Sequence, residues 1–397
     1  MKIYLTAFLY LLFVLDGLTQ TPRFVNPLEG IYGQDFIIVN YVDWDFSGIL
    51  DYNCGTKTYD GHQGTDFVLK SFPQMDSGVL VLAVDTGIVI ATHDGEFDRE
   101  TVSDPSKGLG NYIGLKHSGD LFTYYGHLKM NSLLVEVGDT VFPGQGIAEI
   151  ASSGNSTDPH LHFELWYDSL FVIDPFAGAC GNTETYWLDP IPYDDSYGLW
   201  ESGLTSIIPT LDELRERTED RTEFFIGIDS VITFWALQYG LLDGDVSRID
   251  WFTPSNNLWL SWDLSYNQDW WYHYYWSYMD MPPPGLEGDW RVVYSVNGQI
   301  EKEIDFTISS PVDVSEIDCT HETIFYSAGN ISVTSSNLFS SNSTLEIYDL
   351  SGRKIMSKDL SSTNRSIHSV NFIQVGTYIA AIVENGTPRK VIKFIIR

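Results

Sequence analysis

Histidine and aspartate side chains lie at spacings that suit metal binding in two short motifs of this chain. One motif holds His160 and His162, and the other, earlier in the chain, holds His62 and Asp66. Residues at positions i and i+2 of a β-strand point to the same face, so the paired imidazoles can reach one small volume. A catalytic zinc ion usually takes three nitrogen or oxygen ligands and leaves a fourth position for water. His62, Asp66 and one histidine of the pair supply such a set.

Taken singly, each motif could also be an ordinary polar strand or loop. The histidines of the chain are nevertheless concentrated, because six of the nine fall in the stretch from His62 to His162, which otherwise reads as short strands. This clustering favours a common site over two unrelated polar segments.

Three segments closely resemble the motifs of the lysostaphin-type zinc metallopeptidases and occur in the order of that family. They read Gly61-His62-Gln63-Gly64-Thr65-Asp66, Tyr125-Gly126-His127-Leu128 and Pro159-His160-Leu161-His162-Phe163-Glu164. The resemblance covers about residues 45–180 and includes the turn-rich segment 152–157 that leads into the histidine pair.

The resemblance implies a role for each motif residue. His62, Asp66 and His162 are expected to bind one zinc ion per chain, whereas His127 and His160 are expected to be catalytic residues beside the metal. A zinc-bound water is acidified to a pKa of about 7, and a neighbouring imidazole can take its proton or donate to the oxyanion on the scissile carbonyl. The family's substrate is the peptide portion of peptidoglycan, so the resemblance implies a metalloendopeptidase that hydrolyses such peptides.

Three further residues near the motifs have open roles. Glu164 continues the face of the histidine pair, and it either accepts a hydrogen bond from a ligating histidine or is an exposed strand carboxylate. Gly126 and Asp158 depart from the family's pattern, which commonly has alanine before the catalytic histidine and glycine before the proline. Neither departure removes a ligand, but Asp158 adds charge near the cleft and could alter substrate preference.

The catalytic region is predicted to be an antiparallel β-sheet with almost no helix. Its candidate strands, separated by glycine turns, span residues 78–84, 87–91, 111–116 and 121–125. Ser118-Gly119-Asp120 marks a tight hairpin between the last two. Segments 136–141 and 143–146 are expected to form another turn-bounded pair. Such a sheet can be the floor of a groove that carries the metal.

A second domain is predicted to begin after a proline- and aspartate-containing linker near residue 190. Thr210 and Glu213 have capping-box spacing and could start a short helix, but the remainder alternates like a β-sandwich and resembles immunoglobulin-like accessory domains. The aromatic run Trp270–Trp276 could form a glycan-binding face, or it could fill the sandwich core and interdomain contacts. We favour core and interdomain packing, although neighbours on a strand face opposite sides and some of the run must be exposed or covered by another domain.

The last segment, from about Ser310, resembles the C-terminal sorting domain of type IX secretion. It has a tyrosine-containing strand before a Ser-Gly turn, then a Gly-x-Tyr strand, and a basic and apolar strand at the end. A plain third sandwich domain is the alternative.

The net charge bears on the partners of the chain. The formal charge of -32, with no basic block, disfavours nucleic acid or an anionic lipid surface as partner.

The N-terminus and the cysteines indicate an exported protein. Residues 1–19 read as a signal peptide whose apolar part is too short to span a membrane, and no other segment approaches that length. Cys54 and Cys180 bracket the catalytic region and are predicted to form a disulfide, which leaves Cys319 unpaired.

These observations predict an all-β chain with an antiparallel β-sheet peptidase domain followed by two β-sandwich domains. The expected boundaries are 1–19 for the signal peptide, 20–190 for the peptidase, 191–309 for the accessory domain and 310–397 for the sorting domain. We expect a zinc endopeptidase, secreted or on the cell surface, with peptidoglycan peptides as substrate and the type IX machinery as partner. The alternative is a non-catalytic cell-wall or carbohydrate-binding or activator protein that uses the aromatic middle domain.

Overall fold

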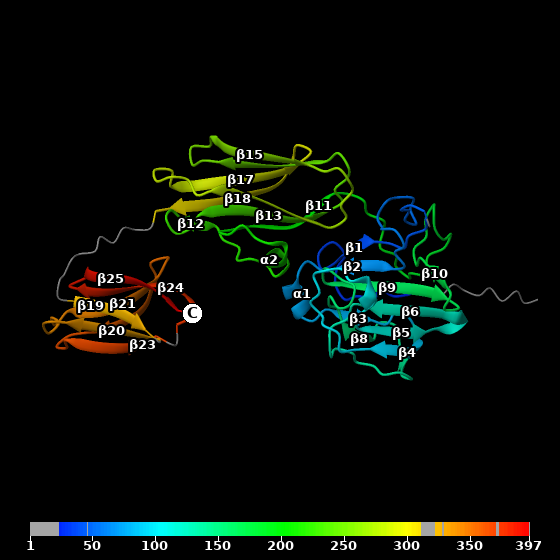
Figure 1. Cartoon of the computed structure of the whole chain (residues 1–397), viewed down its shortest axis with the longest axis horizontal. Helices are drawn as coiled ribbons and strands as arrows, with labels where there is room; N and C mark the ends of the chain where they lie inside the picture. Colours follow the sequence, from blue (N-terminus) through cyan, green and yellow to red (C-terminus); the bar gives the residue numbers. More distant parts are fainter. Residues whose placement is uncertain (1–23, 46, 311–321, 328, 371–372, 397) are drawn as a thin grey trace, which may run out of the picture. The chain divides into compact units, whose positions relative to one another are not determined.

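The computed structural model describes residues 24–45, 47–310, 322–327, 329–370 and 373–396 (Figure 1). The chain divides into two compact units, Met1–Ser310 and Pro311–Arg397. The expected signal peptide and Cys319 lie outside the described residues. Within the described ranges, no helix is both long and apolar enough to cross a membrane.

The first unit begins with an antiparallel sheet that carries all three histidine motifs or their flanks. Its strand order is β1-β2-β9-β6-β5-β4-β7, with β10 paired to β9. The strands are β1 (Ile37–Asn40), β2 (Thr65–Val68), β4 (Gly87–His93), β5 (Tyr112–Lys116), β6 (Leu121–Gly126), β7 (Thr140–Val141), β9 (His160–Tyr167) and β10 (Phe171–Ile173). Figure 1 shows β9, β6, β5 and β4 side by side. The predicted all-β, antiparallel architecture is confirmed.

The hairpin predicted at Ser118-Gly119-Asp120 joins β5 to β6 through a 3-10 turn, as expected. The second predicted pair is wrong. The strand that ends segment 136–141, β7, pairs with β4, and the strand that begins at Gly146, β8 (Gly146–Glu149), pairs with β3 (Leu80–Leu82). The turn residues between them therefore pass the chain from one sheet to another instead of closing a hairpin.

Strand alternation sets the two faces of β9. Leu161, Phe163 and Leu165 are buried in the hydrophobic core of this region, so the side chains between them, those of His160, His162 and Glu164, point to the opposite face. Five of the eight residues of the strand are buried and none of the three polar residues is fully exposed. The polar face is therefore covered by other parts of the chain and forms a site instead of an open surface. A short helix, α1 (Phe72–Asp76), follows β2.

The rest of the first unit is a β-sandwich. One sheet has the order β11-β13-β16 and the other β12-β18-β17-β14-β15, where β12 and β18 run parallel. The strands are β11 (Gly198–Thr205), β12 (Glu223–Phe225), β13 (Val231–Tyr239), β14 (Val246–Phe252), β15 (Leu258–Ser265), β16 (His273–Asp280), β17 (Gly288–Val296) and β18 (Gln299–Ser309). Phe234 and Tyr275 of one sheet share a buried cluster with Trp251, Trp290 and Tyr294 of the other.

The capping box predicted at Thr210 and Glu213 is present. It starts α2 (Leu211–Arg215), where the Thr210 hydroxyl accepts from the Glu213 amide and the Glu213 carboxylate accepts from the Thr210 amide. This helix carries Arg215 at its C-terminal end.

The second unit is a smaller β-sandwich. Its sheets have the orders β19-β20-β23 and β22-β21-β24-β25, around a core that includes Ile331, Leu345 and Ile382. The strands are β19 (Glu322–Ser327), β20 (Asn330–Ser335), β21 (Ser343–Asp349), β22 (Lys354–Asp359), β23 (Arg365–Ser369), β24 (Gly376–Glu384) and β25 (Thr387–Ile396).

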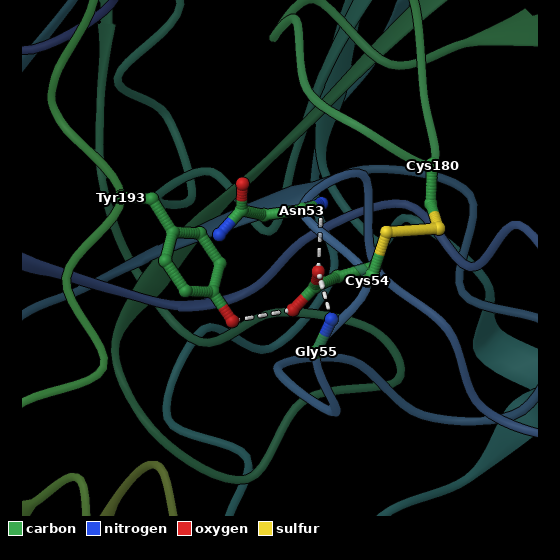
Figure 2. Close-up of a disulfide and its surroundings, with 6 residues drawn as sticks. Asn53, Cys54, Gly55, Cys180 and Tyr193 are labelled. Atoms are coloured by element: carbon green, nitrogen blue, oxygen red, sulfur yellow. Dashed lines mark hydrogen bonds between the residues drawn. A yellow bond between two sulfur atoms is a disulfide. The ribbon is translucent and has the colours of Figure 1, made fainter.

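The predicted disulfide between Cys54 and Cys180 is present, with the two Cα atoms 5.1 Å apart (Figure 2). It joins the loop before the first motif to the loop after β10. Beside it, Asp51 accepts hydrogen bonds from the amides of Asn53 and Gly55 and from the hydroxyl of Tyr193. The loop between β1 and β2 is therefore fixed to the segment that follows β10.

Candidate metal centre

Three predicted ligands converge because β2 and β9 are neighbours in register. Asp66 on β2 is paired with His162 on β9, and His62 lies in the loop that enters β2. The Oδ1 atom of Asp66 lies 2.8 Å from Nδ1 of His162 and 3.2 Å from Nε2 of His62, and the two ring nitrogens lie 3.1 Å apart. All three side chains are buried.

The other ring nitrogen of each candidate ligand has its own partner. His62 Nδ1 donates to the carbonyl of Tyr41 at 2.7 Å, and His162 Nε2 contacts Oε1 of Glu164 at 3.1 Å. These bonds direct His62 Nε2 and His162 Nδ1 toward Asp66, which is how proteins usually orient metal-ligating histidines. Two imidazole nitrogens and one carboxylate oxygen match the ligand chemistry of zinc. The donor set therefore fits the expected metal.

Glu164 has the first of its two possible roles. Its carboxylate is buried, and it lies between His162 and Trp166, whose indole N–H donates to Oε2 at 2.7 Å. A carboxylate that accepts from the distal nitrogen of a ligand increases the basicity of that ligand. The exposed-carboxylate alternative is wrong.

His127 and His160 lie beside this triad with their rings 4.5 Å apart. His127 Nδ1 donates to the carbonyl of Ser153 at 2.7 Å, and His160 Nδ1 donates to the carbonyl of Asp158 at 2.8 Å. Each ring is thereby held with Nε2 as the nitrogen available to the cleft, and His160 Nε2 lies 3.6 Å from Asp66 Oδ1. His127, His160 and His162 also offer ring nitrogens within 4.8 Å of one another.

Burial and neighbouring charges shift the pKa of Asp66, His127 and His160. Burial opposes ionisation of Asp66, but His62, His160 and the hydrogen bond from His162 hold its pKa well below the usual range. Burial lowers the pKa of His127 strongly, helped by repulsion from His160 and His162, and burial also lowers the pKa of His160. Both rings are therefore neutral at pH 7 and can accept a proton.

The pKa of His162 shifts in the opposite direction. Burial opposes its charge, yet hydrogen bonds to Asp66 and Glu164 raise its pKa to about 10. A proton then sits on Nδ1, the atom that faces the triad, and a metal that binds there must displace it.

Two glycines lie where the backbone passes close to other atoms near the site, and the space is tightest at Gly64. A Cβ atom on Gly64 would lie 2.7 Å from Nε2 of His162, so a larger residue would push that ring out of place. A Cβ atom on Gly126 would first meet the end of the flexible Leu109 side chain, at 2.9 Å, so the space at this position does not by itself demand glycine. His127 itself adopts a φ of 62°, a strained conformation of the kind that occurs at functional sites.

Hollows open around the histidines on the polar face of the sheet. One of about 550 Å³ is lined by Asp66, His127 and His160, one of about 610 Å³ by His62 and Trp44, and one of about 520 Å³ by Glu164. Residues of the site therefore line three separate hollows.

Sequence reasoning missed several residues around the site. Asn40, at the end of β1, donates from Nδ2 to Oδ2 of Asp66 at 2.8 Å. Tyr59 packs on His62 with ring centroids 4.4 Å apart. Neither residue belongs to a motif, and a single polar or aromatic residue before the first motif gives no signal. Asp158, noted from the sequence for its charge, forms a bidentate ion pair with Arg215 of the β-sandwich.

Two other histidines have structural surroundings. His117 is buried, with one ring nitrogen 2.9 Å from the carbonyl of Thr86 and the other 2.8 Å from the hydroxyl of Thr123. His93 ends β4 and is exposed beside Glu96. Neither contacts His62, Asp66 or His162.

Comparisons with known proteins relate two segments of the chain to protein families. Residues 60–175 match the model of peptidase family M23, and residues 327–397 match that of the secretion system C-terminal sorting domain. The peptidoglycan DD-endopeptidase ShyA of Vibrio cholerae is 33% identical over 110 residues, which are 28% of this chain and 21% of that protein. Lysostaphin of Staphylococcus simulans is 31% identical over 150 residues, 38% of this chain and 24% of that protein.

Among solved structures, the catalytic domain of lysostaphin from Staphylococcus simulans is similar, with 29% identity, a TM-score of 0.24 and coverage of 34% of this chain and 85% of that one. An uncharacterized metalloprotease of Buchnera aphidicola is 33% identical over 124 residues, and the match spans 28% of its length. The chain thus spans less than a third of the length of the curated relatives that it matches here.

Proposed function

Residues 60–175 form a domain of peptidase family M23, and from this premise we propose that the chain is a zinc-dependent endopeptidase that hydrolyses peptide bonds in the stem or cross-link peptides of peptidoglycan. The observation that carries the proposal is the convergence of His62, Asp66 and His162 on one point, with neutral histidines beside it. The peptidoglycan substrate is suggested by the relatives, which include the endopeptidase ShyA.

In this proposal His62, Asp66 and His162 hold one zinc ion, which when bound would acidify a water and polarise the scissile carbonyl. His160 and His127 supply the proton chemistry. Both are neutral at pH 7 with their proton on Nδ1, so each presents an unprotonated Nε2 to the cleft. Either ring can accept a proton from the attacking water, and the imidazolium that forms can then donate a hydrogen bond from Nε2 to the developing oxyanion. The carbonyls of Asp158 and Ser153 keep the two rings in the required tautomer.

The match of residues 327–397 to a sorting domain supports export. We propose that residues 1–19 direct the chain across the inner membrane and that residues 310–397 are read by the type IX machinery. The mature protein then consists of a peptidase domain (20–190), an accessory sandwich (191–309) and the sorting domain, secreted or held at the cell surface.

The test compares two alanine variants that differ by two positions on one strand. His162→Ala is expected to lose bound zinc and turnover, whereas His160→Ala keeps zinc and loses most of its turnover. Zinc is measured by atomic absorption after dialysis, and turnover by mass spectrometry of peptides released from purified peptidoglycan, with a chelator-treated sample as baseline. His368→Ala, in the second unit, is the matched control.

Two outcomes would contradict the proposal. If wild-type protein releases no more peptide than the chelator-treated sample, the chain is not such an enzyme on this substrate. If His160→Ala loses zinc and His162→Ala retains it, the ligand and proton-transfer roles are reversed.

A further inference from the structure

The β-sandwich contributes one side of the cleft beside the metal centre. The hollow of about 550 Å³ that is lined by His127 and His160 is closed on another side by Asp269, Trp270, Trp271 and Tyr272, which precede β16. We call residues 269–272 the aromatic wall. Side chains from a domain that follows the peptidase in sequence therefore face the catalytic histidines across one cavity.

Hydrogen bonds fix the aromatic wall on the peptidase sheet. The indole N–H of Trp271 donates to the carbonyl of Thr56 at 2.9 Å, and the hydroxyl of Tyr272 donates to the carbonyl of Leu69 at 3.4 Å. The buried ammonium of Lys57 lies 5.4 Å from the centroid of the Trp271 ring, within the range of a cation–π contact. Trp271 therefore enters the cleft in a fixed orientation.

Apolar contacts also hold the aromatic wall against the peptidase domain. Ile37, Val39 and Val68, on the two strands at the edge of the peptidase sheet, form a buried cluster against which Trp271 and Tyr272 pack. Without the sandwich these three aliphatic side chains would face water, which disfavours separation of the two domains. The same contact that covers the sheet edge thus places the wall beside the site.

Trp271 and Tyr272 remain only partly buried although they belong to this contact. A partly exposed indole that is held rigidly in a cavity next to catalytic groups can pack against a peptide backbone or side chain at little entropic cost. Two tryptophans elsewhere in the sandwich, Trp259 and Trp262 on β15, are more exposed but do not line the cavity. Trp271 differs from these two tryptophans because it lines the cavity, and not because it is more exposed.

We propose that the aromatic wall is a substrate-binding surface and that Trp271 positions an extended peptide, beyond the residues next to the cleaved bond, in the peptidase cleft. This inference rests on the proposed peptidase function. Binding far from the cleaved bond lowers the KM of long substrates and leaves short ones unaffected. The accessory domain then selects for peptide length and is a part of the active site.

The experiment uses the full chain and two peptides: the shortest peptide that contains the bond cleaved by the wild type, and the same peptide extended by several residues at both ends. Trp271→Ala is expected to raise the KM of the extended peptide about fivefold, with kcat and the short peptide little changed. Trp271→Phe keeps a ring but not the N–H, so it should restore most of the difference between the peptides. Trp262→Ala is the matched control.

The ratio of kcat/KM between the two peptides decides the outcome. If Trp271→Ala lowers activity on both peptides by the same factor, Trp271 has only a structural role and the inference is overturned. An unchanged ratio with unchanged activity also overturns it. Failure of the wild type to cleave any peptide would instead contradict the proposed function.

Discussion

The ion pair between Asp158 and Arg215 connects the catalytic loop to the β-sandwich, and its removal should have a measurable cost. Arg215 donates from Nε and Nη2 to both carboxylate oxygens of Asp158, at 2.8 and 3.0 Å. The side chains are 8% and 14% exposed, respectively. This pair is bidentate and largely removed from water, unlike most surface ion pairs.

The expected magnitude follows from that burial. Removal of one member of a buried pair leaves the other charged and unpaired, which costs about 3 to 5 kcal/mol. Asp158 retains some exposure and Arg215 also pairs with the exposed Asp212, so Arg215→Ala should lower the free energy of unfolding by about 3 kcal/mol, at the low end of that range. Arg215→Lys should fall between, since an ammonium cannot donate in bidentate fashion.

The pair should also affect catalysis, because the carbonyl of Asp158 holds Nδ1 of His160. A double-mutant cycle of Arg215→Ala and Asp158→Ala, followed by urea unfolding, isolates the coupling energy, which we expect to be about 2 kcal/mol. Arg215→Ala should in addition lower kcat while bound zinc stays at the wild-type level. A coupling energy within about 0.5 kcal/mol of zero would show that the two side chains act independently and would refute the reasoning.

Two further predictions concern the catalytic region. Replacement of Cys54 and Cys180 by serine opens a loop with a sequence separation of 126 residues. In the chain-entropy model the free energy of unfolding should therefore fall by about 5 kcal/mol, which urea unfolding measures. A variant as stable to urea as the oxidised wild type would contradict this prediction. Burial raises the pKa of Asp174 to about 8. Between about pH 4 and 8 the folded state therefore holds a proton on Asp174 that the unfolded state has lost. Because the folded state binds more protons, the free energy of unfolding should decrease as pH rises through this window. The dependence of Tm on pH should become shallower in Asp174→Asn, and an unchanged slope would exclude Asp174 as its source.

The sequence could point to the candidate site residues because their signals are local. His160 and His162 are two apart on one strand, and His62 and Asp66 fall within one loop and strand start. Local spacing fixes which side chains share a face. The register that pairs Asp66 with His162 depends on strands far apart in sequence, and without the family resemblance the choice between His160 and His162 as ligand would have stayed open.

The remaining features could not be read from the sequence because they depend on contacts between distant segments. The pairing of β7 with β4 and of β8 with β3 follows from how two sheets close a common core, and nothing in the intervening turn specifies it. The surroundings of the aromatic run Trp270–Trp276 also depend on contacts between distant segments. Tyr274 and Tyr275 are buried as expected for core and interdomain packing, but the direction of Trp271 into the cleft results from domain docking.

Asp158 shows why the accessory sandwich cannot be a freely exchangeable module in this chain. Its carboxylate accepts hydrogen bonds from Arg215 of the sandwich, and its carbonyl accepts one from His160, a proposed catalytic residue, so one residue belongs to both contacts. The family's usual glycine at this position could supply the carbonyl but not the carboxylate. A chain that kept all five histidine and aspartate positions but carried another second domain would therefore retain the proposed metal ligands. It would nevertheless leave a largely buried carboxylate unpaired beside His160 and would lack Trp271 in the cleft.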